Sequence, residues 1–235
     1  MTRSADIAAH VQDVRRRIAK AAGRAGRSED EINLVAVSKT WPAGDVVDAA
    51  RAGVTDFGEN RAQELTTKAS LIDEDVTWHF VGALQSNKVR HVVGLAHLIH
   101  SIDDLRLAEV VARRASAAGM QQEVLVEVNL SGEATKRGVG PEDAVDLAVR
   151  MATLDGLVVR GLMSIPAWPD DPEESRPAYK ALADLGGRLR TEVPSAGELS
   201  MGMTRDFEVA IEEGATIVRV GEAIFGPRTA SVPPG

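Results

Sequence analysis

The feature of this sequence that most constrains its fold is a regular alternation of short apolar runs with longer amphipathic segments. The runs are too short for helices and are rich in Val, Ile and Leu, as is typical of buried strands. The segments between them carry apolar residues three or four positions apart, which predicts helices packed on one face. Strands are predicted at Asn33–Ser38, Val54–Phe57, Val76–Val81, Leu98–Ser101, Glu123–Asn129, Leu157–Leu162, Glu198–Ser200 and Thr216–Val220. Helices are predicted at Ala43–Ala52, Asn60–Ile72, Ser86–Val93, Asp103–Ala118, Pro141–Ala152, Ser175–Thr191 and Asp206–Glu213.

Strict alternation of strand and helix indicates parallel strands joined by helical crossovers. The eight predicted strands therefore favour an α/β fold, a single (β/α)8 TIM barrel over residues 33–226. An extra N-terminal helix over residues 4–25, with Ser4 as its N-cap, precedes the barrel, and a tail follows at 227–235. A doubly wound sheet is the alternative, but no G-x-G-x-x-G follows the first strand. Without a linker or a shift in composition, residues 1–235 are expected to form one domain.

Composition excludes several classes of protein. The net charge of −8 disfavours a nucleic-acid-binding protein with a basic surface, and three Trp, four Phe and one Tyr are few for base stacking. The absence of cysteine removes disulfides, thiolate nucleophiles and Cys-type zinc sites. No apolar run approaches the ~18 residues of a membrane span, and the N-terminus lacks a signal-peptide core. We therefore expect a cytoplasmic protein without nucleic-acid or membrane partners.

In a TIM barrel the chemistry takes place at the carboxyl ends of the strands, and Lys39 stands at the end of the first one. Burial lowers the pKa of a lysine amine, and a neutral amine can attack an aldehyde to form a Schiff base. A lysine that turns outward into the following loop is the structural alternative.

The ends of the last two strands carry features of a phosphate site. Ser200-Met-Gly-Met-Thr204 joins a predicted strand to a helix, and its hydroxyls and backbone N–H groups suit an anion. Gly221 follows the last strand, and phosphate sites in TIM barrels often use these two loops. A capped helix with a turn glycine would explain the same residues. Arg219 lies inside a strand and needs a partner, which is either a ligand atom or a core carboxylate such as Glu127.

The histidines do not indicate a metal site. His79 and His100 lie in apolar strands, where a histidine is most simply a hydrogen-bonded core residue. No H-x-x-x-H spacing is present, and no G-x-S-x-G motif supports a Ser-His-Asp site. We expect neither a metal nor an acid–base triad.

Five ordered motifs resemble the YggS/PROSC family of pyridoxal phosphate homeostasis proteins. The resemblance runs from the N-terminal helix to Gly226. The motifs are Ala36-Val-Ser-Lys-Thr40, Phe57-Gly-Glu-Asn60, Trp78-His-Phe-Val-Gly82 with Leu84-Gln-Ser-Asn-Lys88, Leu199-Ser-Met-Gly-Met-Thr204 and Val218-Arg-Val-Gly-Glu-Ala-Ile-Phe-Gly226.

The resemblance implies a barrel like the N-terminal domain of alanine racemases, which binds pyridoxal 5′-phosphate (PLP) at its mouth as a covalent aldimine with Lys39. It implies that Arg219 faces the pyridine nitrogen and that Asn60 and His79 line the pocket. The implied phosphate contacts are Ser200, Thr204 and the backbone of Met201, Gly202, Val220 and Gly221. Lys136 matches a proposed secondary PLP acceptor, and Trp41 stands where many members have a second lysine.

The resemblance also implies a function in vitamin B6 homeostasis without robust catalysis, with transient contact to apo PLP-dependent enzymes. No exposed heptad or long edge strand in the sequence demands a partner, so a monomer is expected. An always-charged Arg219 favours a neutral pyridine nitrogen and so weakens carbanion chemistry. The alternative is a small PLP-dependent amino-acid racemase, which needs a second acid or base. The single tyrosine, Tyr179, lies in a predicted helix away from the mouth, and no second domain is expected after the last motif. A barrel aldolase using Lys39 without PLP is a third possibility.

Overall fold

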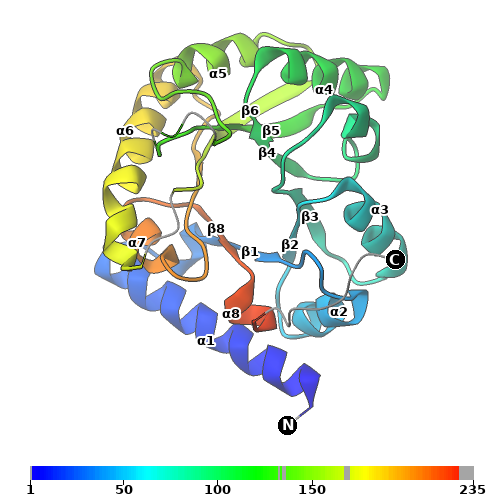
Figure 1. Ribbon diagram of the computed structural model, residues 1–235, viewed down its shortest axis with the longest axis vertical. Coiled ribbons are helices and arrows are strands. Elements are labelled where there is room, and N and C mark those ends of the chain that lie inside the picture. Colours follow the sequence, from blue (N-terminus) through cyan, green and yellow to red (C-terminus); the bar gives the residue numbers. More distant parts are fainter. Residues whose placement is uncertain (1, 132, 134–135, 167–169, 228–235) are drawn as a thin grey trace.

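A closed barrel of parallel strands forms the centre of the molecule (Figure 1). The computed structural model describes residues 2–131, 133, 136–166 and 170–227. Strand β1 pairs with both β2 and β8, and this pairing closes the ring, which confirms the predicted TIM barrel and excludes a doubly wound sheet. The strands are β1 (Asn33–Val37), β2 (Asp56–Glu59), β3 (Thr77–Phe80), β4 (Leu98–Ile102), β5 (Gln122–Glu127), β6 (Leu157–Met163), β7 (Glu198–Ser200) and β8 (Ile217–Val220).

Helices surround the barrel on its outer side (Figure 1). They are α1 (Arg3–Arg24), α2 (Ala43–Arg51), α3 (Ala62–Leu71), α4 (Leu105–Ala117), α5 (Ala144–Ala152), α6 (Arg176–Glu192), α7 (Phe207–Glu212) and α8 (Glu222–Phe225). Three 3₁₀ segments join them: η1 (Glu29–Glu31), η2 (Ser86–His91) and η3 (Pro172–Ser175). The crossover between β3 and β4, predicted as a helix, is therefore the short 3₁₀ segment η2. Of the predicted tail, 227–235, only Pro227 belongs to the described residues.

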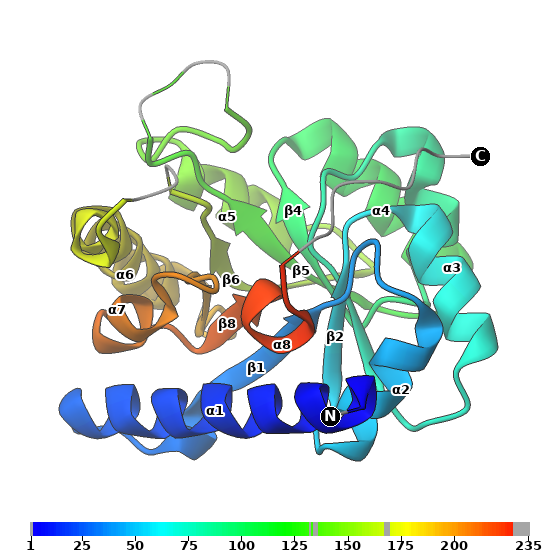
Figure 2. The ribbon, with the colours of Figure 1, turned by 60° about the horizontal axis from the view of Figure 1, so that its bottom comes forward.

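The leading helix α1 packs across the junction between the first and last units of the barrel. Its buried face includes Ile7, Val11, Val14 and Ile18, spaced at helical intervals. It contacts α2, α7 and α8, and Figure 2 shows it lying along one end of the molecule beside α8. The predicted N-cap was wrong by two residues, because the hydroxyl of Thr2, not that of Ser4, accepts the N–H of Ala5.

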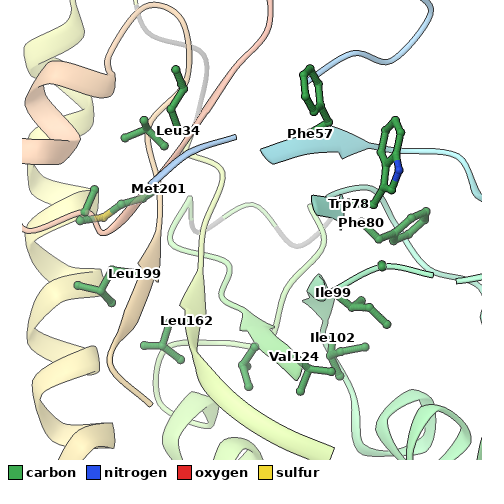
Figure 3. Packing of buried hydrophobic residues seen from close by; sticks show 14 of the residues in the cluster. Leu34, Phe57, Trp78, Phe80, Ile99, Ile102, Val124, Leu162, Leu199 and Met201 are labelled. Atoms are coloured by element: carbon green, nitrogen blue, oxygen red, sulfur yellow. The ribbon is translucent and has the colours of Figure 1, made fainter. Parts of the chain in front are cut away.

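Each strand divides its side chains between two layers of core. Val35 of β1 belongs to an inner layer with Leu98, Leu125, Met163 and Ile217. The alternate residues point outward and pack beneath the helices, as the labelled side chains in Figure 3 show. Because Val35 points inward, the same alternation sends Ser38 outward and Lys39 toward the barrel mouth.

Both ends of the second strand differ from the prediction. The sequence predicts Val54–Phe57, whereas the strand lies at Asp56–Glu59. Gly58, predicted to end the strand, belongs to it and pairs with Val37 and His79. Among the described residues, no helix is both long and apolar enough to cross a membrane.

Candidate active site at the barrel mouth

A cavity of about 500 Å³ opens at the carboxyl ends of the strands. Five of the ten predicted site residues line it: Lys39, Asn60, Thr204, Arg219 and Gly221. The other lining residues are Val37, Trp41, Val81, Gly82, Ala83, Glu127, Lys136, Arg137, Ile165, Pro166, Met203, Glu222 and Gly226. The remaining predicted residues are buried and are not among the lining residues: His79, Ser200, Met201, Gly202 and Val220.

A larger hollow, of about 1230 Å³, lies among α1, η1 and the amino ends of the strands. Its lining contains no lysine or histidine, and its charged groups include the ion pair between Arg27 and Glu31. The barrel-mouth cavity brings the amine of Lys39, the guanidinium of Arg219 and the hydroxyl of Thr204 together at the carboxyl ends of the strands, where TIM barrels carry their chemistry, so it is the candidate site.

The loop after β7 contacts β8 and the start of α8, the two segments to which the phosphate prediction refers. The N–H of Arg219 donates to the carbonyl of Gly202 at 3.0 Å, and the hydroxyl of Thr204 accepts the N–H of Ala223 at 3.3 Å. Gly202 has φ of +90°, and a Cβ there would lie 2.6 Å from that of Ala210. Only glycine lets the loop lie this close to α7. The carboxylate of Asp206 fixes the same loop by accepting the N–H of Met203 at 2.8 Å.

Arg219 is buried at the cavity floor, and its hydrogen bonds within the protein go to serines. Its guanidinium donates to the hydroxyl of Ser200 at 2.5 Å and to the carbonyl of Ser164 at 2.9 Å. Within the described part of the chain, Glu127 is not among its hydrogen-bond partners. Burial lowers the pKa of Arg219, while the charges of Tyr179, Glu127 and Asp206 act in the opposite direction. An arginine nevertheless remains charged in any folded protein, so the cavity floor carries a fixed positive charge.

A chain of hydrogen bonds continues from Arg219 through the interior of the barrel. Ser200 Oγ lies 2.9 Å from His100 Nδ1, His100 Nε2 lies 2.9 Å from His79 Nδ1, and His79 Nε2 lies 2.9 Å from Asp56 Oδ1. Burial, together with the charges of His79 and Arg219, holds the pKa of His100 well below its usual range. A neutral His100 can accept from Ser200 and donate to His79, which then donates to Asp56. His79 and Ser200 therefore support Arg219 from below and do not line the cavity.

Glu127 and Asn60 are polar groups of the cavity that need explanation. Glu127 ends β5 and is only 7% exposed; burial and the nearby Asp103 raise its pKa, against the effect of Arg137 and Arg219. Asn60 Oδ1 is buried and accepts no hydrogen bond from the described part of the chain. Sequence reasoning considered Glu127 only as a partner of Arg219. Its position at a strand end, with the same parity as the inward Leu125, was the available signal.

Two residues of the outer rim were singled out by the resemblance. Lys136 lines the cavity, and its amine forms an ion pair with Glu133 at 2.8 Å. Trp41 lines the cavity too, stacks on Phe225 with ring centroids 6.1 Å apart, and lies beneath the guanidinium of Arg3. The aromatic side chain thus ties α1, α8 and the loop after Lys39 together.

The chain is similar to proteins of known family over nearly its whole length. The model of the alanine racemase N-terminal domain matches residues 9–229. A pyridoxal phosphate homeostasis protein of Aquifex aeolicus (strain VF5) is 46% identical over 214 residues, 90% of this chain and 94% of that protein. A solved structure from Bifidobacterium adolescentis, described as an unknown protein, has a TM-score of 0.90 at 39% identity and covers 95% of this chain and 96% of its own. PipY of Synechococcus elongatus PCC7942, solved with PLP bound, has a TM-score of 0.78 at 35% identity. The match covers 89% of this chain and 100% of the PipY chain.

Proposed function

The chain belongs to the alanine racemase N-terminal domain family and, within it, to the pyridoxal phosphate homeostasis proteins, and on this basis we propose that it binds PLP at the barrel mouth. The observation that carries the proposal is that Lys39, Arg219 and Thr204 line one cavity. A relative of the same fold, PipY, has been solved with PLP bound. In this proposal the chain serves PLP homeostasis by holding the cofactor and releasing it.

The residues present fit this cofactor. The nitrogen of the Lys39 amine would bond to its aldehyde carbon, with the aldehyde oxygen leaving as water, and Thr204 with the backbone of Gly221 would hold its phosphate. Arg219 would face the ring nitrogen from the cavity floor. The unpartnered oxygen of Asn60 offers an acceptor for a hydroxyl group. PLP, when bound, supplies an electrophilic carbon and an electron-withdrawing ring.

The same residues favour storage of the cofactor over catalysis. A guanidinium beside the ring nitrogen disfavours protonation of that nitrogen, which weakens the ring as an electron sink. The racemase alternative would need a second acid or base at the cavity. Tyr179 does not provide it, because it is buried elsewhere and donates its hydroxyl to Asp206 at 2.7 Å, which leaves only Glu127, Glu222 and Lys136 among the described lining residues. We therefore propose that the chain has no robust enzymatic activity.

Further parts of the proposal concern where the protein acts and with what. It acts as a monomer in the cytoplasm and passes PLP to the apo forms of PLP-dependent enzymes. Supporting features are the acidic surface charge of −8 and the absence of cysteine. Lys136, the second amine lining the cavity, would take PLP as a secondary acceptor.

The test is spectroscopic. Titration of the purified protein with PLP should produce the visible absorption band of a lysine-bound cofactor, and borohydride should fix the label on Lys39. Lys39→Ala should lose most of the band, while Lys180→Ala, at an exposed position of α6, serves as the matched control and should retain it. A band of unchanged strength in Lys39→Ala would contradict the assignment. Incubation of the loaded protein with an apo PLP-dependent enzyme, followed by that enzyme's activity, tests release.

A further inference from the structure

Charged side chains behind the barrel anchor the backbone on both sides of Lys39. We infer that Glu59 of β2 and Glu64 and Lys68 of α3 form a clamp that positions Lys39 for its covalent bond to the cofactor. The inference rests on the proposed function, because it concerns how Lys39 performs it. None of the three clamp residues lines the cavity, so they would act through Lys39 as positioning residues.

The first half of the clamp holds Ser38. The amine of Lys68 donates to the carbonyl of Ser38 at 2.7 Å and lies 2.5 Å from Glu59 Oε1. The hydroxyl of Ser38 donates to the same carboxylate oxygen at 2.6 Å. Ser38, Glu59 and Lys68 are all buried, so these contacts are shielded from water. The backbone and the side chain of Ser38 are thereby both tied to one ion pair.

The second half of the clamp holds Thr40. Its backbone N–H donates to Glu64 Oε2 at 2.7 Å, and Glu64 also lies 3.7 Å from the amine of Lys68. Thr40 has φ of +70°, and it is the one non-glycine residue with a positive φ in the part of the chain that the structure describes. This left-handed conformation is unfavourable for a β-branched residue and persists only where the surroundings enforce it. Two hydrogen bonds hold Thr40 in it: the one to Glu64, and the one from the N–H of Trp41 to the carbonyl of Ser38 at 3.0 Å, which closes the turn.

Side chains alternate between the two faces of the strand, so contacts on the outer side of the barrel can fix a residue that points inward. Ser38 faces α3, whereas Lys39 points into the cavity, so fixing the backbone at 38 and 40 fixes the direction of the intervening side chain. Burial raises the pKa of Glu59, the hydrogen bonds from Lys68 and Ser38 oppose the shift, and Glu59 Oε2 has no partner in the described residues. A buried ion pair stabilises a fold less than apolar packing of the same volume would, so the pair of Glu59 and Lys68 is better explained by the positioning of Lys39 than by stability.

The clamp predicts a difference between covalent and non-covalent binding. A covalent bond needs the amine in a defined orientation, and small misplacement has large effects on such a step. Most of the proposed contacts to the phosphate and the ring come from β7, β8 and the loops after them, on the other side of Lys39 from the clamp; Asn60, which follows Glu59, is the exception. The informative pair of ligands is PLP and 4-deoxypyridoxine 5′-phosphate, which keeps the phosphate and ring but lacks the aldehyde.

Three variants of the full-length protein test the clamp. Glu64→Ala removes the acceptor for Thr40, and Glu59→Gln with Lys68→Met replaces the ion pair by neutral groups of similar size. Both should weaken PLP binding by about tenfold or more and slow formation of the visible band, while affinity for the deoxy analogue changes less than about twofold. Glu64→Gln keeps an acceptor oxygen and should restore both quantities. Leu71→Ala, at an exposed position of α3, is the matched control and should behave as wild type.

The outcomes separate the clamp from the proposed function. Equal weakening of both ligands, or of neither, in variants whose circular dichroism and unfolding midpoint show them folded would overturn the clamp. A failure of Glu64→Gln to restore the band would count against it as well. A wild-type protein that forms no band with PLP would instead refute the proposed function.

Discussion

Among single residues, Asp56 connects the buried histidine pair of the barrel to the hollow at the opposite end from the candidate site. Burial by itself would raise the pKa of this carboxyl group. Hydrogen bonds from His79, Asn33 and Thr55 outweigh that effect and lower the pKa from 3.8 to about 2. The ionised form is therefore favoured in the folded protein more than in the unfolded chain.

This shift makes stability depend on pH. Because the pKa is lowered on folding, the contribution of Asp56 is present above pH 4 and is lost as the pH falls through about 2. A shift of this size corresponds to roughly 2 kcal/mol of the free energy of unfolding. We expect the stability difference between wild type and Asp56→Asn, measured by urea unfolding, to shrink from pH 5 to pH 2. A difference that stays constant over this range would show that Asp56 titrates alike in both states.

Comparison at each pH with this variant separates Asp56 from other carboxyl groups. The pKa values of Glu59 and Glu127 are raised, so those groups affect stability in the opposite sense and at higher pH. Asparagine retains a carbonyl oxygen that can accept from His79, so the substitution removes the charge with little change of shape.

The chain from Asp56 to Arg219 also shows where sequence reasoning about the site reached its limit. The sequence placed Ser200 at a strand end and suggested a nearby anion loop. It could not show that the hydroxyl of Ser200 lies between His100 and Arg219. That contact joins β4 to β7 across the barrel interior, and it depends on how the strands are staggered in the closed ring. The two-residue alternation of side chains predicts which face of a strand a residue lies on, but it does not predict which residue of another strand it contacts.

At the scale of elements, α1 shows how an amphipathic pattern contributes to the free energy of unfolding. Ile7 is fully buried on the face that meets the barrel helices. Ile7→Ala should lower the free energy of unfolding by about 2–4 kcal/mol, since it removes buried apolar surface and leaves a cavity. Arg16→Ala on the exposed face of the same helix is the control, with a change within about 0.5 kcal/mol. Equal effects of the two substitutions in chemical denaturation would contradict the packing of α1.

The elements themselves followed from periodicity, whereas their ends did not. All eight predicted strands occur, because in a barrel a short apolar run is most readily buried as a strand of the central sheet. The ends depend on backbone hydrogen bonds that the pattern does not encode. Gly58 continues β2 because its neighbours on both sides pair with it, and the segment Ser86–His91 tightens into η2. Local propensity is overridden in both cases by the surrounding chain.

At the scale of the whole molecule, the candidate site lies across the junction where the ring closes. Lys39 follows β1, Arg219 belongs to β8, and Thr204 follows β7, so groups from the two ends of the barrel meet at one cavity. The helix α1 packs over the same junction from outside. A ligand that contacts all three groups would resist any opening of the barrel that separates β1 from β8.

PLP should therefore stabilise the barrel unevenly. At a free concentration one hundred times its Kd, a ligand that binds only the folded state adds about 2.7 kcal/mol to the free energy of unfolding. Hydrogen exchange by openings that destroy the site should slow by about a hundredfold, whereas openings that leave the site intact should be unaffected. We expect strong slowing in β1, β7 and β8 and little change in amides of α4 and α5 that exchange by local fraying. Lys39→Ala at the same PLP concentration is the control and should show less slowing at the junction. Uniform slowing across α4, α5 and the junction under native conditions would contradict this expectation, because it would mean that exchange proceeds only through global unfolding. Slowing confined to α4 and α5 would place the ligand away from the barrel mouth.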